Sequence, residues 1–341
     1  MKKYLLPPDG NFYKANLHCH SVLTDGTLTP EELKAVYKEK GYSVLAYTDH
    51  DLLIPHDELS EPDFLVLHGF EMEIEEDGPR HPREKKCCHL CFIALEPDNL
   101  TQPMWHRSQY FIKNAVHHKD KVRFDETLPD YTRHYSAEGL NEIIATGREK
   151  GFFVTYNHPT WSLQDYTDYM SYENLNAFEM FNGACLAMGY DDINGRVYDD
   201  MLRGGKRIFA IGADDNHNRF PADSPRWDSG LAWTMIKAEN LDYRTITAAL
   251  ERGDFYASQG PEIFGLWYED GQVHVECSPA ERVFCTYGIR TNEVEFAENG
   301  IGVTHAAFNM PSDRVWMRIT VVDEKGRRAC TNAYYVEEME G

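Results

Sequence analysis

Nine histidine, aspartate and glutamate residues are the side chains of this chain best placed to do chemistry together. They lie between residues 18 and 217, and nearly all follow directly after a short apolar run of strand character. Imidazole and carboxylate groups in combination favour zinc, manganese or iron over calcium. We therefore expect a cluster of divalent transition metals. The nine candidate ligands are His18, His20, Asp25, His50, Glu71, His89, His158, Asp215 and His217.

The spacing of two pairs gives the pattern its strength. His18 and His20 stand two residues apart, and side chains at i and i+2 of an extended strand point to the same side. Asp215 and His217 repeat this spacing. A single histidine is more often a hydrogen-bonded structural residue than a ligand, so the prediction depends on the joint pattern. Glu71 could bridge two ions, with one carboxylate oxygen on each.

Composition limits the classes of partner and compartment. The chain has 341 residues, 42% of them hydrophobic, with 34 basic and 56 acidic side chains and a net charge of −22. Such a surface repels polyanions, so a small anionic substrate is favoured over long nucleic acid. The eight cysteines lack the spacing of a disulfide framework, which fits a reducing compartment. With no apolar signal segment and no long apolar run, we expect a cytoplasmic protein without a membrane span.

Strand-like and helix-like patterns alternate from residue 11 to about residue 255. Strands are expected at 13–18, 43–47, 64–71, 89–95, 151–156, 177–181 and 207–211, with a weaker one at 230–236. Helices with cap and stop signals are expected at 30–40, 137–150, 191–203 and 241–252. This alternation indicates a parallel sheet or barrel.

Two segments depart from the alternation. Residues 96–135 form a long insertion, which is typical of a lid or binding loop, although a surface excursion with incidental histidines explains it equally well. After residue 256 the strands alternate as antiparallel strands do, without helices between them. We therefore expect two domains, an α/β sheet or barrel with the candidate ligands at 1–255 and a β-sandwich-like domain at 256–341.

Several short motifs together resemble those of the PHP family, the polymerase and histidinol phosphatase domain. The resemblance covers residues 11 to about 220 in the right order. Its motifs are Asn16-Leu17-His18-Cys19-His20, Asp25-Gly26, Thr48-Asp49-His50-Asp51, Gly69-Phe70-Glu71, His158-Pro159 and Asp215-Asn216-His217. This chain differs from family members that carry an arginine soon after the His-Pro pair, because it has Thr160 and Trp161 at those positions.

The resemblance implies an α/β fold, a distorted (β/α)7 TIM-like barrel with an appended small all-β domain. It also implies two or three divalent ions (zinc, manganese or iron) and hydrolysis of a phosphoester. By position, three ligand sets are implied: His18, His20, Glu71 and Asp215; Glu71, His89 and His158; and Asp25, His50 and His217.

The leading hypothesis is a phosphoesterase acting on a small phosphorylated metabolite or nucleotide, in which the ions lower the pKa of the attacking water. Asp215 and Asp49 are candidates to orient that water or take its proton. Asn182, Arg219 and Arg226 are candidates to hold the phosphate. Amide or ester hydrolysis, exonuclease action on oligonucleotides and a non-catalytic binding module stay open, as does a homo-oligomer formed through the β domain.

Overall fold

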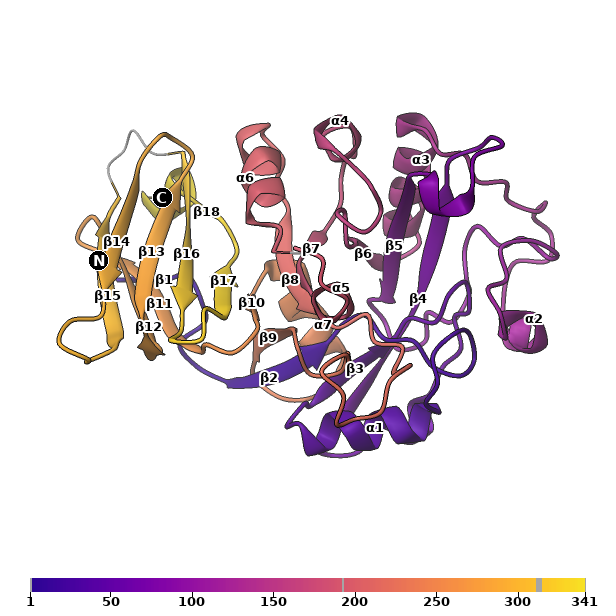
Figure 1. Ribbon diagram of the computed structural model, residues 1–341, viewed down its shortest axis with the longest axis horizontal. Coiled ribbons are helices and arrows are strands. Elements are labelled where there is room, and N and C mark those ends of the chain that lie inside the picture. The colour runs from indigo at the N-terminus through magenta and orange to yellow at the C-terminus, as the bar shows by residue number, and fades with distance from the viewer. Residues whose placement is uncertain (1, 192, 311–314, 341) are drawn as a thin grey trace.

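The computed structural model describes residues 2–191, 193–310 and 315–340. It consists of two parts that lie side by side (Figure 1). We call residues 11–254 the α/β region, and residues 255–340 together with β1 (Lys3–Tyr4) the β region. Within the described residues, no helix is both long and apolar enough to cross a bilayer.

A large mixed sheet runs through the α/β region, with strands in the order β9-β2-β3-β4-β5-β6-β7-β8. These strands are β2 (Asn11–Asn16), β3 (Val44–Tyr47), β4 (Leu65–Glu75), β5 (Cys87–Ala94), β6 (Phe152–Tyr156), β7 (Ala177–Asn182), β8 (Phe209–Ala213) and β9 (Trp233–Ala238). β3 pairs in parallel with its neighbours β2 and β4, and β7 pairs in parallel with its neighbours β6 and β8. Four of these strands, β3, β5, β6 and β7, are buried along their whole length, as strands covered on both faces are.

Two strands of this sheet run against the others. β5 is antiparallel to both β4 and β6, and β9 is antiparallel to β2. The run expected at 64–71 continues to Glu75 and pairs with a strand that already begins at Cys87. The purely parallel arrangement expected from the alternation is therefore wrong at these two strands.

The sheet is also not a closed barrel. Within the described residues, no backbone ladder joins β8 to β9. A side chain spans the gap instead: the Thr234 hydroxyl donates to the Gly212 carbonyl oxygen at 2.9 Å, and the Gly212 amide donates to Thr234 Oγ1 at 3.2 Å. The described residues thus form an open mixed sheet, and the expected TIM-like barrel is not confirmed.

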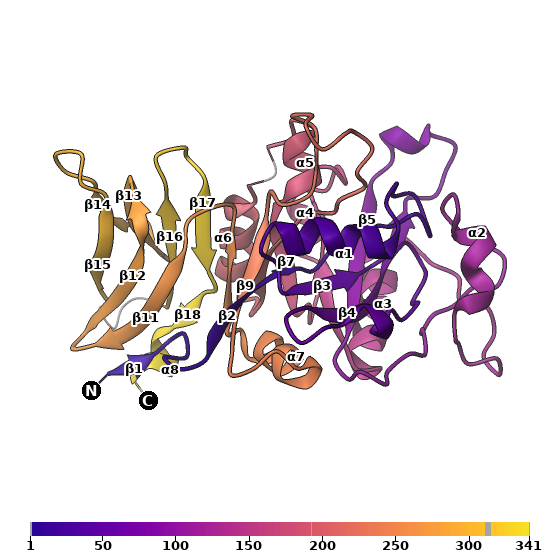
Figure 2. The ribbon, with the colours of Figure 1, turned by 90° about the horizontal axis from the view of Figure 1, so that it is seen from below.

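Helices cover this sheet where the sequence signals place them. The main ones are α1 (Pro30–Glu39), α3 (Ala137–Glu149), α6 (Gly195–Arg203) and α7 (Tyr243–Arg252), and short α5 (Gly183–Ala187) follows β7 directly. The side chain and backbone of Thr29 form a capping box with Glu32 at the start of α1, which lies across β3 (Figure 2). The helix expected at 191–203 starts only at Gly195, and Asp192 lies outside the described residues.

The insertion at 96–135 is mostly loop, with short α2 (Ala115–His118) and a 3-10 turn at Lys119–Lys121. Trp105 and Val122 pack with Leu23 and Leu52 in a small apolar cluster, so the insertion is attached to the loops that follow β2 and β3. Arg133 forms a buried ion pair with Asp51.

The β region consists of two packed layers. One layer is a small antiparallel sheet in the order β1-β11-β12-β15, and the other continues the large sheet through β10, β17, β16, β13 and β14. The strands are β10 (Phe255–Ser258), β11 (Ile263–Glu269), β12 (Gln272–Ala280), β13 (Arg282–Tyr287), β14 (Asn292–Phe296), β15 (Val303–Asn309), β16 (Trp316–Val322) and β17 (Arg328–Thr331). Short β18 (Tyr334–Tyr335) pairs with β16, and the chain ends in α8 (Val336–Glu340).

The N-terminal residues belong structurally to the β region. β1 pairs with β11, and Leu6 packs in the apolar core between the two layers. Both ends of the chain therefore lie in the β region (Figures 1 and 2). This differs from the expected division, which placed residues 1–10 with the α/β part.

Candidate metal centre

The candidate ligands gather at one edge of the large sheet. His18 and His20 follow β2, His50 follows β3, His158 follows β6, and Asp215 follows β8. Carboxyl ends of parallel strands meet at the same edge, which brings these distant segments together.

Glu71 and His89 reach the same edge differently. Glu71 lies inside β4 rather than after it, and a single bridge pairs it with His50. His89 lies near the start of β5, and because β5 is antiparallel its start lies where its neighbours end. This direction explains why His89 is near the beginning of its strand while the other ligands follow theirs.

The first group of ligand atoms consists of His18, His20, Glu71 and Asp215, the first set that the family resemblance implies. His18 Nε2 lies 3.1 Å from Glu71 Oε1 and 3.3 Å from Asp215 Oδ1. His20 Nε2 lies 3.2 Å from Glu71 Oε2 and 3.1 Å from the same Asp215 oxygen. Atoms of all four groups lie within 4.8 Å of one another, close enough to share one cation.

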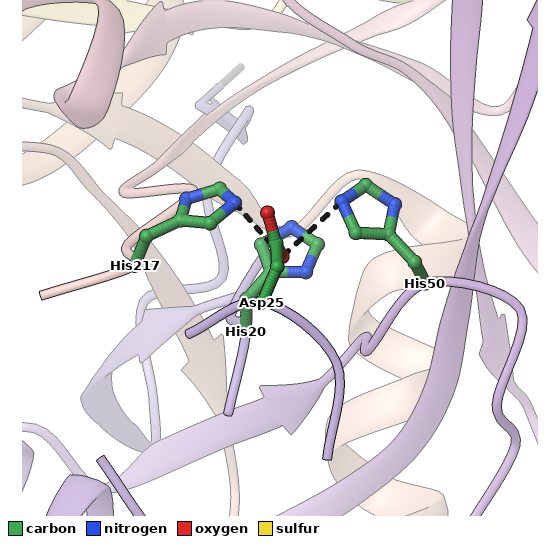
Figure 3. Close-up of side chains that lie close together, drawn as sticks. All are labelled: His20, Asp25, His50 and His217. Atoms are coloured by element: carbon green, nitrogen blue, oxygen red, sulfur yellow. Dashed lines mark ion pairs between the residues drawn. The ribbon is translucent and has the colours of Figure 1, made fainter. Parts of the chain in front are cut away.

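A second group surrounds Asp25. Figure 3 shows the Asp25 carboxylate between the rings of His50 and His217, with His20 beside it. Asp25 Oδ1 lies 3.2 Å from His217 Nε2 and 3.6 Å from His50 Nε2. This is the third implied set, with His20 added by the geometry.

His89 and His158 lie on the other side of Glu71. Glu71 Oε1 is 3.1 Å from His89 Nδ1 and 3.4 Å from His158 Nε2, while Glu71 Oε2 is 3.1 Å from His50 Nδ1. The Glu71 carboxylate therefore faces histidines of the second implied set through one oxygen and a histidine of the third set through the other, as a bridging ligand would.

The hydrogen bonding of His18 tests whether a cation fits this cluster. Its Nδ1 lies 2.6 Å from Glu179 Oε1, so the Nδ1 proton is donated to that carboxylate. In the neutral ring, Nε2 then carries a lone pair, and it faces His20 Nε2 at 3.0 Å as well as two carboxylates. Acceptors that face acceptors in a dry interior need either a proton or a metal cation between them, so the arrangement fits a cation.

Unpaired buried atoms support the same fit. Several polar atoms of the cluster are buried without a hydrogen-bond partner among the described residues: His20 Nδ1, Asp25 Oδ1, His50 Nδ1, Glu71 Oε2 and His89 Nε2. Buried polar atoms are normally paired, so five orphaned ligand-type atoms in one cluster fit a metal centre. The donor set of imidazole and carboxylate suits zinc, manganese or iron.

Without an ion, protons must offset the carboxylates. Burial alone would raise the pKa of Glu71, but His18, His89 and His50 outweigh it and hold that pKa well below its usual range. Burial likewise lowers the pKa of His20, but hydrogen bonds to Asp215 and Glu71 outweigh it and raise the pKa to about 10. Burial and the neighbouring His20 lower the pKa of His50 to about 3. The cluster is thus strongly coupled, with cationic and neutral imidazoles side by side.

The backbone at two candidate ligands is left-handed. His158 has φ 26° and Asp215 has φ 53°, values that cost non-glycine residues about 1–3 kcal/mol each. The surrounding structure holds both: the His158 amide donates to Glu179 Oε2 at 3.0 Å, and the Asp215 amide donates to the His18 carbonyl oxygen at 3.0 Å. Such strain at ligand positions is typical of a functional site.

Glu179 is the residue of this site that the sequence analysis missed. Its carboxylate lies inside β7, fully buried, and accepts hydrogen bonds from His18 Nδ1, the His158 amide and Asn182 Nδ2. A charged residue in the apolar run Ala177-Phe178-Glu179-Met180-Phe181 was the available signal. Glu73 was missed as well; it lies 3.6 Å from His89 Nε2, next to Cys87.

Asp49, a candidate to orient the attacking water or take its proton, is bound to the scaffold around the ligands. It accepts hydrogen bonds from the Ser21 amide, the Ser21 hydroxyl and the Thr24 hydroxyl at 2.6–2.8 Å, so it organises the loop between His20 and Asp25. It does not line the cavity beside the cluster. Its role toward the water stays a prediction.

Asn182 is likewise committed to its neighbours. Its Nδ2 donates to Glu179 Oε2 at 2.9 Å and to Asp215 Oδ2 at 3.2 Å, and its Oδ1 caps α5 by accepting from the Cys185 amide. It is fully buried. Both ends of the amide contact protein groups, two of them carboxylates of the cluster, and its expected part in holding phosphate stays a prediction.

The two expected phosphate-binding arginines do reach the cavity beside the cluster. This cavity has a volume of about 690 Å³ and is lined by ligand residues, by Arg219 and Arg226, and by apolar side chains. Arg219 forms an ion pair with Asp25 Oδ2 at 2.6 Å. Arg226 lies over the ring of Phe220 and makes no ion pair with any described residue. Arg226 is therefore the cation more available to an anionic ligand.

Comparison with known proteins gives likenesses to solved structures. No family model and no curated protein sequence matches the chain. One similar structure is a two-domain protein from Bacteroides vulgatus, described as containing a predicted PHP-like metal-dependent phosphoesterase. It is 14% identical, with a TM-score of 0.43, and the match covers 98% of both chains.

Two further structures match a smaller share of this chain. A candidate metal-dependent phosphoesterase from Bifidobacterium adolescentis is 17% identical over 73% of this chain and 98% of its own, with a TM-score of 0.39. An amidohydrolase from Chromobacterium violaceum, with bound sulfate and no metal, is 16% identical over 60% of this chain and 87% of its own, with a TM-score of 0.40.

Proposed function

We propose that this chain is a metal-dependent hydrolase that cleaves a phosphate ester. The observation that carries the proposal is the convergence of three carboxylates and several imidazole nitrogens in one buried cluster, as around His18. When bound, divalent cations at such a site lower the pKa of a water and neutralise charge that develops on phosphoryl oxygens.

The side chains of the cluster divide the work. Glu71 and the histidines hold the cations, and Glu179 fixes His18 and the backbone of His158. Asp215 is the ligand carboxylate most open to the cavity, with a side chain 12% exposed against 8% for Asp25 and 1% for Glu71. Its neighbours hold its pKa well below the usual range, because His18 and His20 outweigh the effect of burial. Ionised Asp215 is therefore placed to orient the attacking water.

The cavity suggests a small organic phosphoester. Its volume of about 690 Å³ is in the range of small-molecule sites. Its apolar lining includes Trp161, Met188, Tyr190 and Phe220, and the Trp161 ring lies 5.2 Å from the His89 ring. We assign these apolar side chains to the organic part of the ester, and Arg226 to its phosphate.

A substrate panel tests this proposal. Protein purified without chelators is assayed with added manganese or zinc on phosphomonoesters, phosphodiesters, short oligonucleotides and small amides or esters. We expect turnover of at least one class of small phosphoester, abolished by chelation and restored by metal. Turnover confined to amides or carboxylic esters would replace the phosphoesterase proposal by the amide or ester alternative. No turnover of any class, with metal bound, would favour a binding module.

A further inference from the structure

A second cavity lies where the α/β region meets the β region. Its volume is about 630 Å³. It is lined by Lys14 on β2, Lys40 at the end of α1, Trp233 at the start of β9, and the turn between β16 and β17 that carries Lys325 and Arg327. Its walls therefore come from both regions.

The charge of this cavity is opposite to that of the whole molecule. Four lining side chains are basic and none is acidic, in a chain with a net charge of −22. Arg327 is paired with Asp323 at 2.7 Å, but Lys14, Lys40 and Lys325 make no ion pair with any described residue. A cavity lined by cations of one sign concentrates counter-ions of the other sign.

Lys14 is the most enclosed of these cations. Its Nζ lies 3.9 Å above the Trp233 ring and 4.1 Å above the Tyr42 ring, and it donates to the Lys40 carbonyl oxygen at 3.2 Å. Burial lowers its pKa to about 8, because the more distant Asp214 and Glu262 do not offset the lost hydration. A bound anion would supply the counter-charge that the protein itself does not.

Two glycines let the cations lie close against the backbone. A Cβ atom at Gly230, where φ is +89°, would lie 2.7 Å from Lys40 Cδ. A Cβ atom at Gly260 would lie 2.6 Å from the central guanidinium carbon of Arg327. Any larger residue at either position would push a basic side chain out of its place.

The basic cavity adjoins the metal-ligand cavity. Ala187 of α5 lines both cavities, and the neighbouring residues Pro225 and Arg226 line one each. α5 and the loop before β9 therefore contribute to the walls of both cavities.

We propose that Lys14, Lys40, Lys325 and Arg327 form a second binding site, for a multivalent oxyanion of the phosphate class. The anion has two sources: a second acidic group on the substrate, which rests on the proposed hydrolase function, or a separate small anion, which does not.

Calorimetric titration with inorganic pyrophosphate tests the site without turnover. The proteins compared are the wild type, Lys40→Gln/Lys325→Gln, and a control of equal charge change, Lys121→Gln/Lys150→Gln, at exposed positions outside both cavities. Each is also measured with His18→Ala/His20→Ala added, so that binding at the cluster is removed. We expect the Lys40/Lys325 variant to bind at least about tenfold more weakly in both backgrounds, and the control to bind as the wild type does. Equal affinity in all of them, or binding lost only on changing the histidines, would overturn the proposal.

Kinetics then separate the two sources. If the anion is part of the substrate, Lys40→Gln/Lys325→Gln raises KM about tenfold for substrates with two phosphate groups and leaves KM unchanged for those with one. If the anion is separate, pyrophosphate binds to the wild type equally well in the presence of a saturating monophosphate substrate. If no substrate is turned over, the proposed function fails, while the titration still decides whether the basic site exists.

Discussion

The interiors of the two regions differ in polarity. The β region encloses an apolar core, in which Val283, Ile319 and Val321 are fully buried among other apolar side chains. The α/β region buries Glu71, Glu179 and a group of histidines at the edge of its sheet. Burying ionisable groups destabilises a fold unless partners compensate for the lost hydration. The comparison teaches that apolar packing stabilises the β region, whereas the buried carboxylates of the α/β region would be compensated by bound cations.

The largest effect is expected from removing ligands of the cluster. His18→Ala/His20→Ala should lower kcat/KM by about 10³-fold or more, because cations held there contribute several kcal/mol to the transition state. Circular dichroism should show that the fold is retained. A matched pair in the β region, His274→Ala/His305→Ala, changes two stacked histidines on neighbouring strands and should leave kcat/KM unchanged. Equal losses in both double variants would remove the distinction between the regions.

Truncation in the apolar core of the β region should act on stability alone. Ile319 is fully buried on β16, and Ile319→Ala should lower the free energy of unfolding by about 2–5 kcal/mol. Activity per folded molecule should stay the same, measured by kcat below the unfolding transition. Ile301→Ala, at a side chain 75% exposed, serves as the control and should cost no more than about 0.5 kcal/mol. A fall in kcat with Ile319→Ala would show that the β region shapes the site.

A smaller effect is expected from changing Glu179, which orients the candidate ligand His18. Glu179→Gln keeps the size of the side chain but removes the charge that orients His18, so metal affinity or activity should fall about 10–100-fold. Metal affinity is measured by competition with a chelator dye. Glu173→Gln, at an exposed ion pair with Lys206, is the control for loss of a carboxylate. If Glu179→Gln bound metal as tightly as that control, Glu179 would have no positioning role.

The smallest effect concerns Lys14, where the two regions meet. Its pKa is lowered on folding from 10.5 to about 8, chiefly by burial and further by Lys40, with Asp214 and Glu262 acting in the opposite direction. Between these two values the unfolded chain binds more protons, so a rise in pH favours the folded form. The stability of the wild type relative to Lys14→Met should therefore increase between pH 7 and pH 10. Denaturant unfolding at both pH values measures it, and a constant difference would mean that Lys14 titrates alike in both states.

Much of the site could be predicted from local geometry. The i, i+2 pairs His18/His20 and Asp215/His217 needed only the alternation of an extended chain and the rule that parallel strands end at one edge. The roles of Asp49 and Glu179 depend on neighbours far away in sequence. Asp49 directly precedes His50, so alternation directs its side chain away from the ligand side and toward the loop at Ser21.

The fold, like the site, could be predicted only where local sequence signals determine it. Cap and stop signals predicted α1, α3 and α7 because those signals act within one turn of a helix. The direction of β5 and the open seam between β8 and β9 depend on which strands pair, and strand propensity carries no information about direction. The pairing of β1 with β11 joins residues at opposite ends of the chain, beyond the reach of any local pattern.

Elemental analysis gives the most direct test that the α/β region is completed by cations. Wild-type protein and His18→Ala/His20→Ala are purified without chelators, exposed to zinc, manganese or iron, and freed of loosely bound ions. The wild type should hold at least one transition-metal ion per chain, and the variant clearly fewer. A wild-type protein that stays below one ion per chain after this loading, or a variant that holds as much as the wild type, would contradict the metal centre.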